Sequence, residues 1–338
     1  IPLPGCPPIV IALLPTNGKE SGKDIHIQHL ELQKMAANAK LPIIALAADG
    51  ASTEVLAQHL MDSEQSEEPP LQYLYPLYGI KLEAPVFRVT GPLISVTDPP
   101  HARKTARNQP QYGTHTASLG IGYLVNRSLI DLQHLGTSGL MVRDVENVDK
   151  QDDGAARRVF HSLALQAMMI PSEGTSPARI RSGFEGITVY FFVLGTLFEA
   201  WMSPSMELNE RVLAALRARF WLHHWRRHIT ILSQRFPDLY SLARSFISAA
   251  SFQIFNRLCD TLVLLALAYT EAYPSTPFCI WLIGIDFVEH FFGIARQFLP
   301  NFSYSEFIKM AQHIMVRQRI LESGILKSKR ERTSASGY

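Results

Sequence analysis

Charged residues are scarce in this chain of 338 residues: they make up 18% of it and nearly cancel, leaving a formal net charge of +2. Such a balance creates no large field of one sign, so overall electrostatics alone do not identify a nucleic-acid-binding protein. Apolar residues make up 47% of the chain, which is enough to bury a core and excludes a disordered chain. The length favours two domains, or one domain with a large insertion.

Cysteine is also rare. The three cysteines, Cys6, Cys259 and Cys279, are far apart and include no CxxC spacing. This pattern indicates reduced, buried thiols in an intracellular protein and does not favour a zinc site. The 12 histidines include no HExxH pattern, so they do not indicate a metalloprotease-type site either.

Long apolar runs are missing as well. The longest, Ile187–Phe198 and Thr261–Thr270, are shorter than the roughly 20 residues that span a bilayer. We therefore expect core elements and no membrane segment. The chain begins at Ile1 without a basic and apolar leader, so we expect it to be a piece of a longer protein.

Two apolar runs end in an aspartate. Pro42–Ala48 has strand character and is followed by Asp49 and Gly50, and Pro92–Thr97 is followed by Asp98 and two prolines. The prolines force the backbone out of β structure, and α/β folds carry their functional groups at the carboxyl ends of strands. The two carboxylates suggest a metal site, although Asp-Gly is also a common turn pair.

The first hundred residues alternate strands with helices. A strand over Pro8–Leu14 and a helix over Asp24–Lys40 precede the Asp49 strand, and this order predicts a right-handed crossover and a parallel strand pair. A second helix is expected over Ser52–Met61. This part of the chain therefore has α/β character.

The rest of the chain has mainly helical patterns. We divide the sequence into a partial α/β core (1–110), an all-helical insertion (111–275), returning helices (276–322) and a basic tail (323–338). Helices are expected over Ser118–Leu135, Asp152–Met169, Glu207–Ala272 with a break at Pro237, Ile280–Phe298 and Tyr304–Leu321.

One of the returning helices carries acidic residues on a single face. Asp286, Glu289, Gly293 and Arg296 follow the spacing i, i+3, i+7 and i+10, and phenylalanines surround them. A helix this aromatic is expected to be buried, and a buried carboxylate needs a cation or a metal. Glu289 therefore either forms a salt bridge, for example to Arg296, or binds a metal.

A basic helix lies in the predicted insertion. Arg217, Arg226 and Arg227 are candidates for contacts to a DNA backbone, and Trp221 and Trp225 are candidates for stacking on bases. The alternative is an amphipathic helix whose basic face is simply solvated. The sequence leaves both interpretations open.

Three sequence blocks resemble the signature blocks of P-element and THAP-type DDE/D transposases. They are AADGAS with Asp49, DPPHARKTARN with Asp98, and DFVEHFFGIARQ with Glu289. The second block is the most specific of the three. The resemblance covers roughly Ile9–Lys104 and Ile280–Met315, and the region between them matches by position only.

The resemblance implies an RNase H-like core that a large helical insertion interrupts before the last core helix. Asp49 would be the second acid of the site and Glu289 the third. The strand with the first aspartate is expected before Pro8, so the core is incomplete at the amino end of this sequence. The implied reaction is DNA strand cleavage and transfer in the nucleus. The implied metal is Mg²⁺ or Mn²⁺, because these ions prefer oxygen ligands such as carboxylates.

Asp98 has three candidate roles: a metal ligand, a cap for the helix that begins at Pro99, or an anchor for Arg103 or Lys104. Lys104 and Arg107 are candidate phosphate contacts. The implied partner is DNA, with a homo-oligomer also considered. The tail Lys327–Tyr338 is either a nuclear-localisation patch or a soluble terminus.

Three functions remain after this comparison. The first is a transposase-derived enzyme, and the second is a domesticated, catalytically inactive DNA-binding or protein-interaction module. The third is an unrelated α/β enzyme that uses Asp49 alone.

Overall fold

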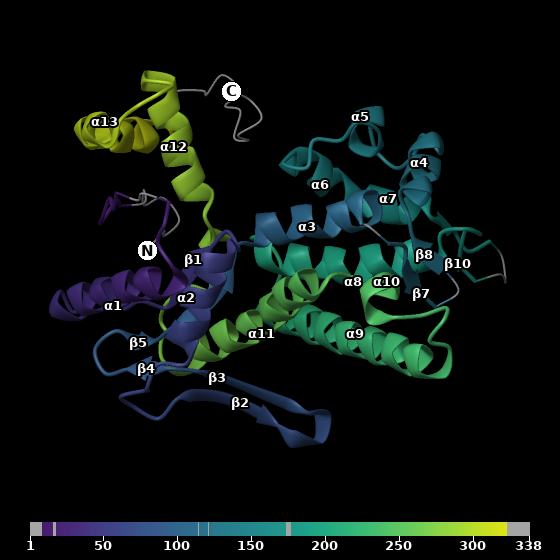
Figure 1. Cartoon of the computed structure of the whole chain (residues 1–338), viewed down its shortest axis with the longest axis horizontal. Helices are drawn as coiled ribbons and strands as arrows, with labels where there is room; N and C mark the ends of the chain where they lie inside the picture. Colours follow the sequence, from purple (N-terminus) through teal and green to yellow (C-terminus); the bar gives the residue numbers. More distant parts are fainter. Residues whose placement is uncertain (1–8, 16–17, 114, 121, 174–176, 323–338) are drawn as a thin grey trace. The chain divides into compact units, whose positions relative to one another are not determined.

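The computed structural model describes residues 9–15, 18–113, 115–120, 122–173 and 177–322 (Figure 1). The chain divides into two compact units, one formed by Ile1–Asp98 with Leu267–Tyr338 and the other by Pro99–Ala266. The sequence placed the corresponding boundaries at 110/111 and 275/276. Cys6 and the basic tail 323–338 lie outside the described residues.

The first unit combines short strands with helices. Its elements are α1 (Gly22–Asn38), β1 (Ala45–Ala48), α2 (Ser52–Asp62), β2 (Leu71–Tyr75), η1 (Pro76–Tyr78), β3 (Ile80–Ala84), β4 (Val86–Phe87), β5 (Gly91–Pro92), β6 (Ile94–Thr97), η2 (Ile280–Leu282), α12 (Asp286–Phe298) and α13 (Tyr304–Glu322).

A parallel strand pair lies at the centre of the described part of this unit. β1 pairs with β6, and Ala48 lies opposite Thr97. All four residues of β6 are buried. Helix α1 begins with a capping box between Ser21 and Asp24, and it packs on α2 so closely that a Cβ on Gly22 would lie 2.7 Å from the Cβ of Leu56.

The predicted strand over Pro8–Leu14 is wrong for the described residues 9–14, where no strand forms. Pro8 lies outside the described residues. Ile9 is 74% exposed and Ile11 is 72% exposed, whereas a strand inside a sheet would bury such side chains. Val10 and Leu13 instead pack against the helical cluster of α12 and α13. The parallel partner of β1 is therefore β6.

The second unit is mainly helical. Its elements are α3 (Pro99–Tyr112), β7 (Ala117–Leu119), β8 (Gly122–Leu124), α4 (Asn126–His134), α5 (Val142–Val145), α6 (Asp153–Val159), α7 (Ser162–Ala167), β9 (Met169–Ile170), β10 (Arg179–Ile180), α8 (Glu185–Met202), α9 (Leu208–Arg235), α10 (Leu242–Ser245) and α11 (Ala249–Glu271), which ends in the first unit.

The prediction of an all-helical insertion is wrong because two small antiparallel strand pairs, β7 with β8 and β9 with β10, occur in this unit. The predicted helix over Ser118–Leu135 begins only at Asn126. Gly120 has a φ of +61°, which suits a turn better than a helix. A Cβ on Gly122 would lie 2.8 Å from the backbone nitrogen of Gly186, so glycine permits the contact between β8 and α8.

Aromatic residues of α8 form the core of the second unit. Tyr190 and Trp201 are fully buried. The Tyr190 hydroxyl donates to the backbone oxygen of Ala106 at 2.9 Å, and the Trp201 indole donates to that of Leu258 at 3.1 Å. Both buried polar groups therefore have partners, as expected in a packed interior.

Helix α11 is the one described helix that is long and apolar enough to cross a membrane, with a mean hydropathy of 1.3 over its best window. It is longer than the apolar run Thr261–Thr270 considered above. About 61% of that window is buried inside the protein. Because core helices have the same length and composition, this helix is only weak evidence for a membrane span.

Candidate carboxylate site

Asp49 and Asp98 follow neighbouring parallel strands of the first unit. Ala48 at the end of β1 lies opposite Thr97 at the end of β6, and the Asp98 N–H donates to the Ala48 oxygen at 2.8 Å. Neighbouring strands lie about 4.8 Å apart, so the two aspartates leave the sheet side by side. The sequence predicted the strands, and their direct pairing brings these two carboxylates to one edge.

Asp98 connects this edge to helix α12. Its side chain is 2% exposed, and its Oδ1 accepts a hydrogen bond from the Ile285 N–H at 3.0 Å. Ile285 immediately precedes α12, where unpaired N–H groups and the helix dipole favour an anion. Asp98 therefore holds the start of the helix that carries Glu289. This role was missed because the two residues are 187 positions apart.

Glu289 lies one helical turn beyond this contact. Its N–H donates to the Ile285 oxygen at 3.0 Å, and four residues of helix advance about 6 Å along the axis. Glu289 is half-buried, whereas Asp286 is exposed. The expectation of a fully buried helix is wrong, because α12 buries one face with Phe291 and leaves Val288 54% exposed.

Asp49 also forms the local turn that its Asp-Gly sequence indicates. Its Oδ1 accepts from the Ala51 N–H at 2.9 Å, and Gly50 has a φ of +88°. This Asx-type turn redirects the chain from β1 into α2. Asp49 is exposed, and a carboxylate has lone pairs beyond the one used here. The turn therefore does not prevent metal binding by Asp49.

Glu54 is a further carboxylate near Asp49 that the sequence analysis missed. It lies in the first turn of α2, and its Oε2 is 3.8 Å from the Nε2 of His29. Burial, together with the negative charge of Asp49, raises the pKa of Glu54. Burial and the nearby His26 lower the pKa of His29. The Asp49 edge thus includes a third acid whose protonation depends on its surroundings.

Replacing Asp49 with asparagine is expected to lower the pKa of Glu54, because one of the two effects that raise it is the Asp49 charge. A titration of side-chain carboxyl carbons by NMR would measure this change. The matched control is Asp131→Asn, which removes an exposed carboxylate of α4. An unchanged Glu54 titration in Asp49→Asn would show that the two carboxylates do not interact.

The donor atoms at this edge suit a hard divalent cation. Asp49, Asp98 and Glu289 offer carboxylate oxygens, which Mg²⁺ and Mn²⁺ prefer over nitrogen or sulfur. Among the residues that the structure describes, no group of three or more His, Cys, Asp or Glu side chains is arranged to hold a metal ion. The chemical fit therefore rests on ligand type, because the shared edge brings together Asp49 and Asp98, whereas Glu289 lies on α12.

The predicted phosphate contacts Lys104 and Arg107 lie inside the second unit. Lys104 is 8% exposed and forms a salt bridge to Asp153 at 3.3 Å. Arg107 is fully buried, and its Nη2 donates to the Asp149 oxygen at 2.8 Å. Burial lowers the pKa of Arg107, with nearby acidic groups acting in the opposite direction. These placements favour a structural role in joining α3 to the segment before α6.

The three arginines of α9 that are candidate DNA contacts, Arg217, Arg226 and Arg227, are exposed. At about 100° of rotation per residue, Arg227 points opposite the buried side of the helix, and Arg217 and Arg226 lie on either flank. The Arg217 guanidinium lies 5.5 Å from the ring centre of Phe192, and that of Arg226 lies 4.8 Å from that of Phe252. These contacts position both charges at the surface.

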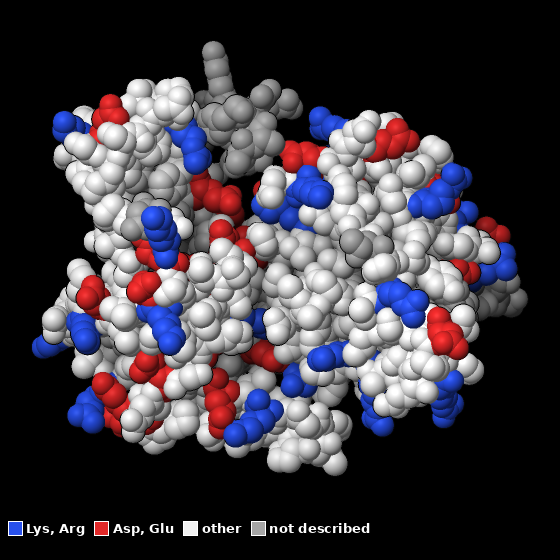
Figure 2. Space-filling model, in the orientation of Figure 1, with Lys and Arg blue, Asp and Glu red and all other residues white. Residues whose placement is uncertain are grey.

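The tryptophans of α9 do not face solvent as base-stacking groups would. Trp225 is 4% exposed, and its indole donates to the Ser118 oxygen at 2.7 Å. Trp221 packs against it with ring centres 5.0 Å apart. Trp225 therefore belongs to the core of the unit, and Trp221 lies partly buried beside it. Figure 2 shows basic and acidic side chains interspersed over the face it presents.

These observations can be compared with known proteins. The fold resembles that of a transposase. The match is a chain of the Drosophila P element transposase strand transfer complex, with a TM-score of 0.54 and 14% identity, covering 90% of this chain and 65% of that one. At this identity the likeness concerns the fold alone. No family model and no curated protein sequence matches the chain.

The transposase-like fold extends beyond the three sequence blocks. The blocks cover roughly Ile9–Lys104 and Ile280–Met315, whereas the structural match includes 90% of the chain. It therefore includes much of the intervening, mainly helical region. This chain spans 65% of the length of the transposase chain, so that protein's whole activity does not transfer with the fold.

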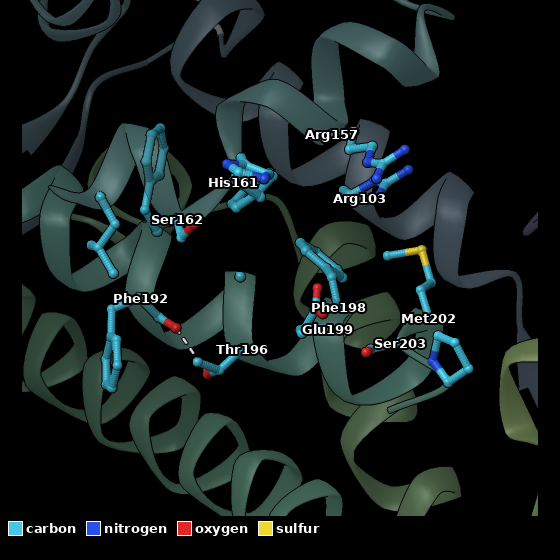
Figure 3. Close-up of a pocket in the computed structure, with 15 residues that line it drawn as sticks. Arg103, Arg157, His161, Ser162, Phe192, Thr196, Phe198, Glu199, Met202 and Ser203 are labelled. Carbon is cyan, nitrogen blue, oxygen red and sulfur yellow. Dashed lines mark hydrogen bonds between the residues drawn. The ribbon is translucent and has the colours of Figure 1, made fainter. Parts of the chain in front are cut away.

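The second unit of this transposase-like fold contains a cavity of about 740 Å³ (Figure 3). Arg103 of α3 and Arg157 of α6 lie beside each other at one side of it, with His161 nearby and Phe198 and Glu199 of α8 opposite. The cavity thus combines cationic, acidic and aromatic groups. Its lining residues all belong to the second unit, whereas Asp49, Asp98 and Glu289 belong to the first.

Proposed function

We propose that this protein derives from a DDE/D transposase of the P-element and THAP type, with an RNase H-like core. The observation that carries the proposal is the pairing of β1 with β6, because it delivers Asp49 and Asp98 to one sheet edge while Asp98 binds the start of the Glu289 helix. The transposase-like fold supports the same interpretation.

In this proposal Asp49 and Glu289 hold Mg²⁺ or Mn²⁺, and Asp98 either joins them or positions α12 through the Ile285 N–H. When bound, such ions activate an attacking water or 3′-hydroxyl and stabilise the leaving oxygen of a phosphodiester. The protein's own contribution is to fix the carboxylates on a strand edge and on a helix. The proposed location is the nucleus, where the DNA substrate lies.

A catalytically inactive DNA-binding or interaction module is the second candidate. It is favoured by the structural uses of two of the acids, since Asp49 closes a turn and Asp98 accepts the Ile285 N–H. Both contacts persist without any reaction. Metal binding and cleavage separate the two candidates.

The exposed arginines of α9 provide the DNA-binding test. Changing Arg217, Arg226 and Arg227 together to glutamate is expected to weaken DNA binding and to reduce the slope of log affinity against log salt, by up to about one for each lost phosphate contact. Fluorescence anisotropy with a DNA duplex at several salt concentrations would measure both quantities.

The matched control for this test is Arg127→Glu on α4, whose side chain is 75% exposed. It changes an exposed arginine outside α9 and is expected to leave the salt slope unchanged. Because the control changes the net charge by a third as much as the α9 variant, a control effect about one-third as large would indicate a net-charge effect. An unchanged affinity in the α9 variant would exclude these arginines from the DNA interface.

A further inference from the structure

The turn end of the β2–β3 hairpin in the first unit exposes four large apolar side chains. Leu74 is 48% exposed, Tyr75 is 47%, Leu77 is 80% and Tyr78 is 57%. Tyr75 and Tyr78 stack with ring centres 5.1 Å apart. Such a concentration of exposed large apolar side chains commonly marks an interaction site. Figure 1 shows β2 and β3 running side by side as a long hairpin.

Strand β2 is an edge strand without the usual protection. Its sequence, Leu71–Tyr75, contains neither a charged residue nor a proline, although proteins normally place such residues on open edges. β3 is the strand that pairs with β2 among the described residues. β3, by contrast, carries Lys81 and Glu83 as exposed residues, so β2 offers the less protected edge.

The two faces of the hairpin carry different side chains, apolar on one and partly polar on the other. On one face Leu71, Tyr73 and Tyr75 lie opposite Ala84, Leu82 and Ile80. On the other face Gln72 donates to Glu83 at 2.8 Å, and Leu74 lies opposite Lys81. Leu71, Ile80, Leu82 and Ala84 of the first face are buried within the chain. A further strand would therefore add to the hairpin through the open edge of β2 rather than through this face.

We propose that β2 pairs antiparallel with β2 of a second copy of this chain, centred on Tyr73, to form a four-stranded sheet. This register places Tyr73 opposite Tyr73, Leu71 opposite Tyr75 and Gln72 opposite Leu74. Each apolar residue keeps its face, because antiparallel pairing about one residue preserves the alternation of side chains.

A second copy suits this edge because β2 is self-complementary. Tyr73 gains an aromatic partner, and Leu71 and Tyr75 pair across the new interface, both of which are favourable cross-strand pairs. Without charged residues in β2, no like charges meet. The proposal is independent of the carboxylate site, so it can succeed or fail without affecting the proposed reaction.

The substitution Leu74→Glu tests this interface without disturbing the hairpin. Within one chain the new carboxylate lies opposite Lys81, which is a favourable pair. In the proposed dimer the two new carboxylates lie diagonally across the symmetry axis and repel each other. We expect the dissociation constant of the dimer, measured by sedimentation equilibrium of the whole chain, to increase about tenfold.

A second substitution is expected to restore the dimer. In the double variant Leu74→Glu with Gln72→Lys, each new ammonium group lies opposite a new carboxylate of the other copy. Within each chain it also lies opposite Glu83. We expect the double variant to dimerise as well as the unmodified chain. The control, Leu239→Glu, changes a leucine that is 71% exposed in the second unit and is expected to have no effect.

Hydrogen exchange provides an independent measurement. Amides of Leu71–Tyr75 are expected to gain protection as the protein concentration rises through the dissociation constant, because β2 N–H groups become paired. A chain that stays monomeric, a dimer insensitive to Leu74→Glu, or a Leu74→Glu defect that Gln72→Lys does not repair would each overturn the proposal.

Discussion

Replacing Asp49 with asparagine, or Glu289 with glutamine, is expected to abolish divalent-metal-dependent DNA cleavage by the full-length protein. Each substitution preserves the size of the side chain but removes a negative oxygen ligand. Because bound metal ions contribute several kcal/mol of transition-state stabilisation, we expect a loss of at least about 1,000-fold in rate. Cleavage of a labelled duplex in single-turnover assays would measure it.

Folding must be monitored in the same variants, since Asp49 accepts the Ala51 N–H at 2.9 Å. Asparagine retains an acceptor oxygen for this turn, so circular dichroism and thermal unfolding are expected to change little. Asp131→Asn serves as the control, because it removes an exposed carboxylate of α4. Undiminished cleavage in both site variants would refute a catalytic role for these acids.

The second large effect concerns Asp144, which is expected to be essential for the stability of the second unit. Its carboxylate is fully buried and accepts two hydrogen bonds from Arg158, at 2.7 and 2.6 Å, and one from the Met141 N–H at 2.8 Å. Asp144→Asn leaves Arg158 with only the longer contact to Asp152, at 3.9 Å. Removing one partner of a buried ion pair typically costs about 3–5 kcal/mol in the free energy of unfolding.

The Asp144–Arg158 pair also predicts that the stability of the protein depends on pH. Burial alone would raise the pKa of Asp144, but the hydrogen bonds from Arg158 and Met141 outweigh it and hold the pKa below its usual value. A lowered folded-state pKa stabilises the protein above the unfolded-state value of about 3.9. This contribution is expected to disappear as the pH falls from about 4 through the lowered pKa.

Urea unfolding at neutral and acidic pH would measure both effects. The matched control is Asp131→Asn, which breaks an exposed pair to Arg127 at 2.9 Å and is expected to cost less than about 1 kcal/mol. The difference in stability between Asp144→Asn and the unmodified chain is expected to shrink at acidic pH. Equal effects of the two substitutions would contradict the assignment of Asp144 as a buried anchor.

The sequence predicted those parts of the fold that depend on local patterns. The apolar run before Asp49 and the run before Asp98 become β1 and β6. The helices α1 and α2 lie where periodicity placed them, because short-range spacing and capping determine their positions. The strand predicted over Pro8–Leu14 is wrong for residues 9–14, because an apolar run can also pack on a helical cluster, as Val10 and Leu13 do.

The features of the site that the sequence did not predict depend on contacts between residues far apart in the chain. Asp98 binds the Ile285 N–H across 187 positions, and no local pattern reveals such a partner. Glu54 resembled an ordinary acidic residue in the first turn of a helix, and only the folded structure shows its interaction with Asp49. Arg107 looked like a phosphate contact because its motif is basic, yet it is fully buried.

The central claim is that Asp49 and Glu289 bind the same divalent ion. Paramagnetic broadening of NMR signals by Mn²⁺ tests it directly, without any requirement for cleavage. We predict that Mn²⁺ broadens signals around both Asp49 and the first turn of α12, and that either Asp49→Asn or Glu289→Gln removes the broadening at both places. Broadening at both places that survives both substitutions, or an absence of Mn²⁺ binding at this edge, would contradict the account.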